Sequence, residues 1–93
     1  MTRTLIADVH AIVRLGITFL LRNIFDKSYT ITEAFNGDQV LQQLHASSFD
    51  LLVTDMNMPG TAGFVLLEKA LSVQPGLKIL VISVNPDKLF ADK

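Results

Sequence analysis

The sequence contains no cysteine, which excludes disulfides, thiolate metal sites and thiol catalysis. The absence fits a reducing compartment. The chain also has no large excess of charge of either sign: eight basic and nine acidic residues give a net charge of −1. It has no basic run that could bind the phosphates of a nucleic acid. The first apolar run is stopped by Asp8 and is too short for a signal peptide or a membrane span. We therefore expect a soluble cytoplasmic domain that does not contact membranes.

Glycine is scarce as well. The five glycines are scattered, and no Gly-Lys-Ser/Thr follows an apolar run, so the sequence has no glycine-rich phosphate loop. What the chain has in abundance is apolar residues, which make up 49% of its 93 positions. That is enough for the core of one domain, and the length is too short for two.

Short apolar runs alternate with segments of helical periodicity. We expect strands at residues 5–7, 29–34, 51–54 and 77–82, and helices near residues 10–25, 38–44 and 64–71. Gly16 within the first helix predicts a close approach of that helix to the sheet, and Asn85-Pro86 predicts the start of a fourth helix. Strands that alternate with helices predict an α/β domain with a parallel sheet and helices on both faces.

Polar residues follow three of the predicted strands. Asp8 follows the first, Asp55 the third and Ser83 the fourth. Because ligands of open parallel sheets bind beyond the carboxyl ends of the strands, these side chains are expected at one edge. Two carboxylates and a hydroxyl suit Mg²⁺, and a carboxylate beside Mg²⁺ can attack phosphorus.

A structural explanation competes with this functional one, because short polar residues often end strands where the chain turns. It carries more weight for Asp8 and Ser83 than for Asp55, whose strand is buried and runs into a Pro-Gly turn. The isolated His10 and His45 are expected to be structural or solvated, with His10 at the start of the first helix.

The residues resemble a known family. Residues 5–10 (LIADVH), residues 12–16 (IVRLG) and the Asp55–Gly60 segment (DMNMPG) are similar to response-regulator receiver domains, in particular the LuxR/NarL-like subfamily with a helix-turn-helix output domain. The similarity covers essentially all 93 residues, and the Asp55 segment is its most specific part.

The resemblance implies a flavodoxin-like (CheY-like) fold and a signalling role rather than an enzymatic one. Asp55 would accept a phosphoryl group from a sensor histidine kinase, and Ser83 would bind it and act as the switch. Asp8, Asp55 and the main-chain carbonyl of Asn57 would hold Mg²⁺. DNA would be bound only by an output domain of the parent protein.

Two departures from the family pattern stand out. The family usually has a second acid after Asp8, and Val9 stands there, so Mg²⁺ binding is expected to weaken. The family also has a fifth strand, which ends in a lysine, and a last helix. We expect residues 1–93 to be a receiver domain that lacks both. The fourth strand would then be an edge, which predicts a homodimer that covers it.

Two other functions remain open at this point. A degenerate receiver could act as a protein-interaction or dimerisation module without phosphorylation, as Val9 and the missing lysine suggest. An aspartate-nucleophile phosphatase would need a general acid two residues after Asp55, where the sequence has Asn57.

Overall fold

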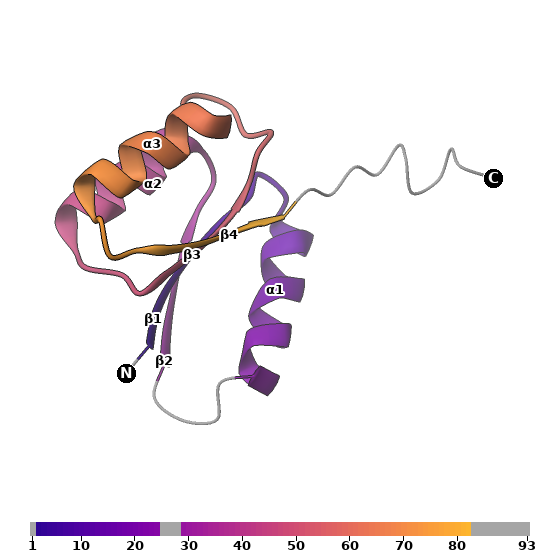
Figure 1. The fold of residues 1–93 in the computed structure, drawn as a ribbon. Coiled ribbons are helices and arrows are strands. Elements are labelled where there is room, and N and C mark those ends of the chain that lie inside the picture. Colours follow the sequence, from indigo (N-terminus) through magenta and orange to yellow (C-terminus); the bar gives the residue numbers. More distant parts are fainter. Residues whose placement is uncertain (1, 25–28, 83–93) are drawn as a thin grey trace.

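The computed structural model describes residues 2–24 and 29–82 of the chain, and Figure 1 shows their arrangement. These residues form four strands and three helices, in the predicted alternating order. The elements are β1 (Thr2–Ala7), α1 (Ala11–Ile24), β2 (Tyr29–Ala34), α2 (Gly37–Ala46), β3 (Leu51–Asp55), α3 (Gly63–Val73) and β4 (Lys78–Ile82). The predicted helix after Asn85-Pro86 lies outside the described residues.

The strands form one parallel sheet in the order β2-β1-β3-β4. The chain passes from β1 to β2 on one side and then to β3 on the other side of β1. The strand order therefore reverses between β1 and β3, which is where open α/β sheets bind their ligands.

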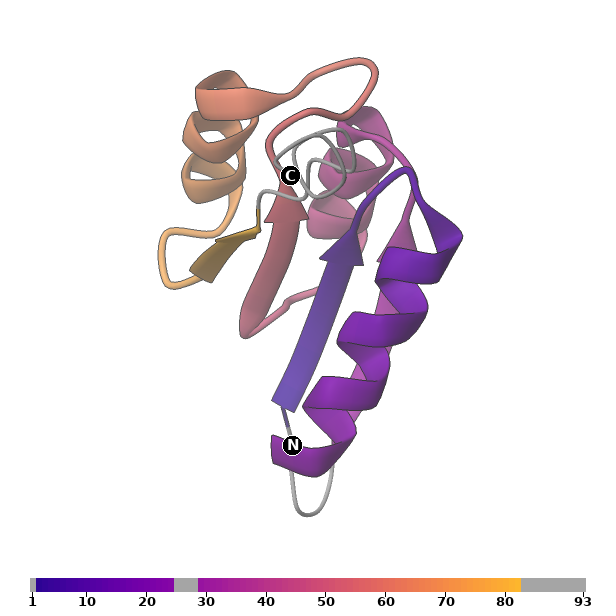
Figure 2. The same ribbon diagram turned by 90° about the vertical axis from the view of Figure 1, so that its right-hand side faces the viewer.

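The sheet is covered on both faces, as predicted. Successive side chains of a strand point to opposite faces, so Leu5 contributes to one core and Ile6 to the other. The larger core lies beneath α2 and α3 and includes Val40 and Leu66. The smaller core lies beneath α1 and includes Ile17. Among the elements that the structure describes, α1 is the one helix on its face of the sheet, and α2 and α3 lie on the other face (Figures 1 and 2).

Gly16 does not have the predicted role. It is exposed on the outer side of α1, and apart from its chain neighbours and the backbone of its own helix no described atom lies within 4 Å of the position that a Cβ would occupy there. The residues of α1 that approach the sheet are Ile17 and Leu21, which are buried. A glycine within a helical pattern was thus the wrong signal for close packing.

The turn before α2 is confirmed as a helix cap. The side chain of Asn36 accepts a hydrogen bond from the backbone N–H of Gln39 (2.9 Å), and the side chain of Gln39 accepts one from the backbone N–H of Phe35 (2.7 Å). The first bond satisfies a donor that the first turn of a helix otherwise leaves unpaired, and the second pairs the N–H of the residue before the cap with the helix.

Within the described part of the chain, β4 ends the sheet. Leu80 and Val81 on this strand are each about half exposed, in line with the predicted edge. The dimer predicted to cover this edge stays a prediction. Across residues 2–24 and 29–82, no helix has the length and apolar character needed to span a membrane.

The centre of the sheet contains one polar atom that packing leaves unpaired. Thr4 on β1 is fully buried, and its hydroxyl has no hydrogen-bond partner among the described residues. Thr54 on β3 is also buried, but its hydroxyl donates to the main-chain carbonyl of Asp55 (3.1 Å).

Thr4→Val is expected to raise the free energy of unfolding by about 1 kcal/mol, because it replaces an unpaired buried hydroxyl with a methyl group of similar size. The matched control Thr54→Val is expected to lower it by a similar amount, since it removes a hydrogen-bond donor. Urea unfolding followed by circular dichroism measures both. A destabilised Thr4→Val variant would contradict the unpaired hydroxyl.

Candidate functional site

Asp8 and Asp55 lie together at the carboxyl ends of the two central strands. Ala7 on β1 pairs with Thr54 on β3, so the two acids are the next residues on neighbouring strands. Both are buried, with exposed fractions of 1% for Asp8 and 4% for Asp55. The structure thus brings them to one edge, as the topology predicts. Ser83, the third predicted residue of this edge, lies outside the described residues.

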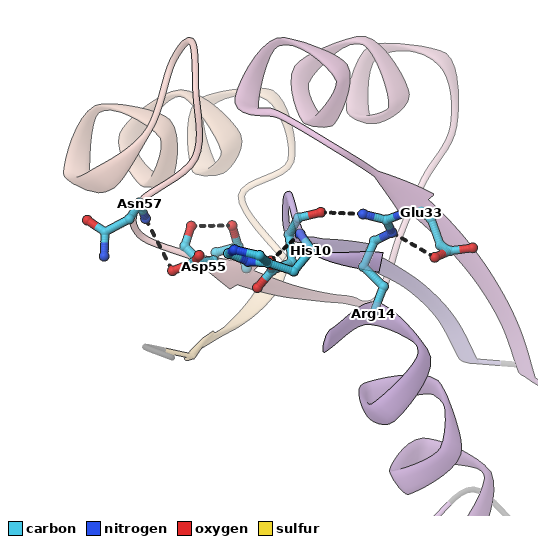
Figure 3. A network of polar contacts seen from close by, with 7 residues as sticks. His10, Arg14, Glu33, Asp55 and Asn57 are labelled. Carbon is cyan, nitrogen blue, oxygen red and sulfur yellow. Dashed lines mark hydrogen bonds and ion pairs between the residues drawn. The ribbon is translucent and has the colours of Figure 1, made fainter. Parts of the chain in front are cut away.

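His10 lies beside the two acids: Figure 3 shows it near Asp55, and it is hydrogen-bonded to Asp8. Its main-chain carbonyl accepts the first hydrogen bonds of α1, from Val13 and Arg14 (both 3.1 Å), so it begins the helix as predicted. Its backbone N–H donates to Asp8 Oδ1 (2.8 Å), and its ring Nδ1 lies 2.9 Å from the same oxygen. One potential ligand atom each from Asp8, His10 and Asp55 lies within 4.8 Å of the others.

The interpretation of His10 as an isolated histidine was therefore incomplete. That interpretation placed His10 correctly at the start of the helix, but it did not predict the contact with Asp8. A signal was present, because a side chain two residues after a strand-ending acid can fold back onto that acid. His45, by contrast, is exposed on the last turn of α2, away from any acid cluster among the described residues.

Asn57 orients the Asp55 carboxylate. Its backbone N–H donates to Asp55 Oδ1 (3.2 Å), a local turn that Asp side chains commonly form. Met58, which follows Asn57, is buried in the larger core and so anchors the loop after β3 to that core. The part of the Asn57 carbonyl in metal binding stays a prediction.

The loop between β3 and α3 docks on the start of α2. Gly37 is required there, because a Cβ at this position would overlap the main-chain carbonyl of Thr61. Asp38 accepts a hydrogen bond from the Thr61 hydroxyl (3.0 Å). Gly60 turns the same loop with a φ of 77°, in the left-handed region that glycine adopts readily. These contacts hold the segment that follows Asp55.

Val9 occupies the position between Asp8 and His10 and is 43% exposed. Its side chain adds no oxygen to the site. The oxygen donors of Asp8 and Asp55 fit a hard divalent cation, while the set lacks the acid that a residue at position 9 could supply.

Arg14 is a buried positive charge that holds the loop between β1 and α1. Its Nη1 donates to the main-chain carbonyl of Asp8 (2.7 Å), and its Nε donates to Glu33 Oε1 (2.9 Å). The guanidinium carbon lies 4.3 Å from the centre of the Phe35 ring, which is cation–π geometry. Arg14 thus links the backbone beside the site to β2, and the half-exposed Glu33 is its ion-pair partner.

Arg14→Met keeps most of the length and the apolar stem but removes all three interactions. We expect the free energy of unfolding to fall by about 2 kcal/mol, because hydrogen bonds to a charged group are lost and the Asp8 carbonyl loses its partner. The control Arg22→Met, at an exposed position of the same helix, is expected to change it by less than about 0.5 kcal/mol. Equal urea midpoints for the two variants would show that Arg14 does not hold the loop.

Comparison with known proteins agrees with the fold and with the geometry of the site. The response regulator receiver domain family matches residues 4–93. Response regulator GacA of Pseudomonas viridiflava is 32% identical over 90 residues, which are 97% of this chain and 42% of that protein. Oxygen regulatory protein NreC of Staphylococcus carnosus is 31% identical over 87 residues, 92% of this chain and 40% of that protein. The chain therefore spans less than half the length of these curated relatives.

Solved structures show the same fold. The RcsB response regulator of Salmonella typhimurium superimposes with a TM-score of 0.80 at 28% identity, over 90% of this chain and 43% of that one. Response regulator TrrA of Thermotoga maritima, solved in complex with Mg²⁺-BeF, has a TM-score of 0.80 at 24% identity, over 95% of this chain and 74% of that one. The fold, the pair of buried acids and the match over residues 4–93 agree, and the chain belongs to the response regulator receiver domain family.

Proposed function

We propose that this chain is a phosphoacceptor module in which Asp55 takes a phosphoryl group from a sensor histidine kinase. The observation that carries the proposal is the pairing of Asp55 with Asp8: two carboxylates, buried at the ends of adjacent strands, at the switch point of the sheet. Family membership supports the same role, since receiver domains are signalling domains.

Asp55 is set for attack on phosphorus by the way that its two oxygens are used. Oδ1 accepts the Asn57 N–H, and no hydrogen bond engages Oδ2 among the described residues. In the proposed transfer, a carboxylate oxygen forms the new O–P bond, the P–N bond of a phosphohistidine breaks, and the imidazole leaves with the electron pair of that bond. The product is an acyl phosphate on Asp55.

A divalent cation fits this arrangement, because two buried carboxylates and an incoming phosphoryl group concentrate negative charge. Asp8, Asp55 and the main-chain carbonyl of Asn57 are the proposed ligands of Mg²⁺. When bound, Mg²⁺ offsets charge on the carboxylate and on the phosphoryl oxygens. Val9 contributes no ligand, so we propose that Mg²⁺ binds more weakly here than at a site with an acid in this position.

The parent protein is proposed to regulate transcription in the cytoplasm. The chain covers 42% of GacA, and structures of the similar RcsB include complexes with promoter DNA. A DNA-binding output domain in the parent is consistent with these relatives. The switch role of Ser83 and a homodimer also belong to this proposal.

Phosphorylation of Asp55 can be measured by intact mass after incubation with acetyl phosphate and Mg²⁺. The wild-type chain is expected to gain the mass of one phosphoryl group, and Asp55→Asn is expected to gain none. Asp50→Asn is the matched control, because Asp50 is an exposed acid next to the opposite end of β3. A wild-type mass that stays unchanged at saturating Mg²⁺ would instead support a module that works without phosphorylation.

Val9→Asp tests the missing ligand. We expect the Kd for Mg²⁺ to fall by about tenfold, because the site gains a carboxylate and changes to groups around a metal typically alter its affinity by this factor or more. Val9→Asn has the same shape without the charge and should change the Kd much less. Isothermal titration calorimetry measures both variants. Equal affinities for Mg²⁺ in Val9→Asp and in the wild type would contradict a metal contact at position 9.

A further inference from the structure

The imidazole of His10 is a group that the proposed phosphoryl transfer does not use. Its ring nitrogen lies 2.9 Å from Asp8 Oδ1, and the three potential ligand atoms of Asp8, His10 and Asp55 lie within 4.8 Å of one another. The ring is half exposed, with a side-chain exposure of 47%, while the Asp8 side chain is 1% exposed. His10 therefore lies at the mouth of the acid pair, between it and the solvent.

We propose that His10 is a third protein ligand of the cation held by Asp8 and Asp55, and that this ligand set favours a borderline transition-metal ion such as Co²⁺ or Zn²⁺ over Mg²⁺. The inference rests on the cation site of the proposed function and specifies which ion that site prefers. In this proposal, the His10 nitrogen provides the ligand that an acid at position 9 would otherwise provide through an oxygen.

The geometry supports this assignment. In an octahedral site with metal–ligand distances of about 2.1 Å, neighbouring ligand atoms are about 3 Å apart and opposite ones about 4.2 Å apart. The 2.9 Å contact between His10 Nδ1 and Asp8 Oδ1 is a hydrogen bond, and its length is also the spacing of neighbouring ligands, so a cation would take the place of the proton between the two atoms. The 4.8 Å limit on the whole group exceeds the opposite-ligand spacing only slightly.

Hydrogen bonding leaves ligand atoms available. Asp8 Oδ1 accepts from the His10 backbone N–H and is hydrogen-bonded to the His10 ring nitrogen, whereas no hydrogen bond engages Oδ2 of either acid among the described residues. Arg14, the buried cation nearest in sequence, binds the main-chain carbonyl of Asp8 and the Glu33 side chain rather than the Asp8 carboxylate.

The chemical selectivity follows from the donor atoms. Mg²⁺ prefers oxygen ligands in a near-ideal octahedron and gains little from an imidazole. Imidazole nitrogen suits Zn²⁺, Co²⁺ and Ni²⁺, whose affinities for mixed nitrogen and oxygen sites exceed those of harder ions. Loss of an acid at position 9 and gain of an imidazole from position 10 thus act in the same direction, away from Mg²⁺.

The purified chain can be titrated separately with Co²⁺ and Mg²⁺. Co²⁺ binding is read from its visible absorption, which no thiolate can complicate because the chain has no cysteine. His10→Gln keeps a side chain that can donate to Asp8 but lacks the ring nitrogen. We expect it to raise the Kd for Co²⁺ by about tenfold or more, since loss of a direct ligand is at least as severe as loss of a supporting one. The Kd for Mg²⁺ should change by less than about twofold.

His45→Gln is the matched control, because it removes the second of the two histidines at an exposed position on α2. It should leave both affinities unchanged. A second measurement avoids variants altogether: Zn²⁺ should shift the ring ¹⁵N resonances of one histidine strongly and leave the other in place. Co²⁺ affinity that is unchanged in His10→Gln, or lost equally in His45→Gln, would overturn the proposal.

The outcome of this test can be distinguished from the outcome of the test of the phosphoacceptor role. If Co²⁺ binding depends on His10 and Asp55 while acetyl phosphate leaves the mass unchanged, the metal ligand stands and the phosphoacceptor role fails. If the mass rises with Mg²⁺ while His10→Gln binds Co²⁺ like the wild type, the phosphoacceptor role stands and the metal ligand fails.

Discussion

The parallel pairing of β1 with β3 is the constraint on which the rest of the site depends. It places two residues that are 47 positions apart in the chain at the ends of adjacent strands. Both strands are buried, because α1 covers one face of the sheet and α2 and α3 cover the other. The acids therefore lie at a closed edge of the core, where negative charge needs a compensating partner. A cation and a phosphoryl group are partners of the right chemistry.

Sequence patterns predicted most of this framework. Each of the seven elements was expected within a few residues of its observed bounds, because the apolar periods of 2 and 3.6 are strong in this chain. The meeting of Asp8 with Asp55 followed from a general rule on parallel sheets and needed no side-chain detail.

What the sequence did not predict depends on local backbone direction. The contact of His10 with Asp8 arises because the chain turns sharply between β1 and α1, which brings the backbone N–H and the ring of residue 10 to one oxygen. The burial of Arg14 depends on Glu33 and Phe35, which arrive from a different strand and loop. Gly16 failed as a packing signal because its helix turns that position toward solvent. Periodicity describes which face a residue occupies, but not these tertiary contacts.

Position 9, where the family resemblance predicts an acid, lies in a structural setting that accommodates valine. Valine is nearly half exposed there and disturbs no core, so the fold accepts it readily. Asp8 is held from three directions, by its own oxygen contacts with His10, by the Arg14 bond to its carbonyl and by its backbone N–H bond to the carbonyl of Ala34 (3.2 Å). Asp8 is thus held by contacts that do not depend on the side chain at position 9.

The overlap that any side chain at position 37 would make with the Thr61 carbonyl links the evolutionary histories of two segments. A lineage that replaced Gly37 would have to reshape the loop after Asp55 in the same step, or lose the setting of that acid. The constraint on residue type differs between positions 37 and 61. The contact at position 61 uses a main-chain carbonyl, which every residue possesses. A substitution of Thr61 would therefore remove only the hydrogen bond from its hydroxyl to Asp38. Of the two positions, the one without a side chain is the less free to vary.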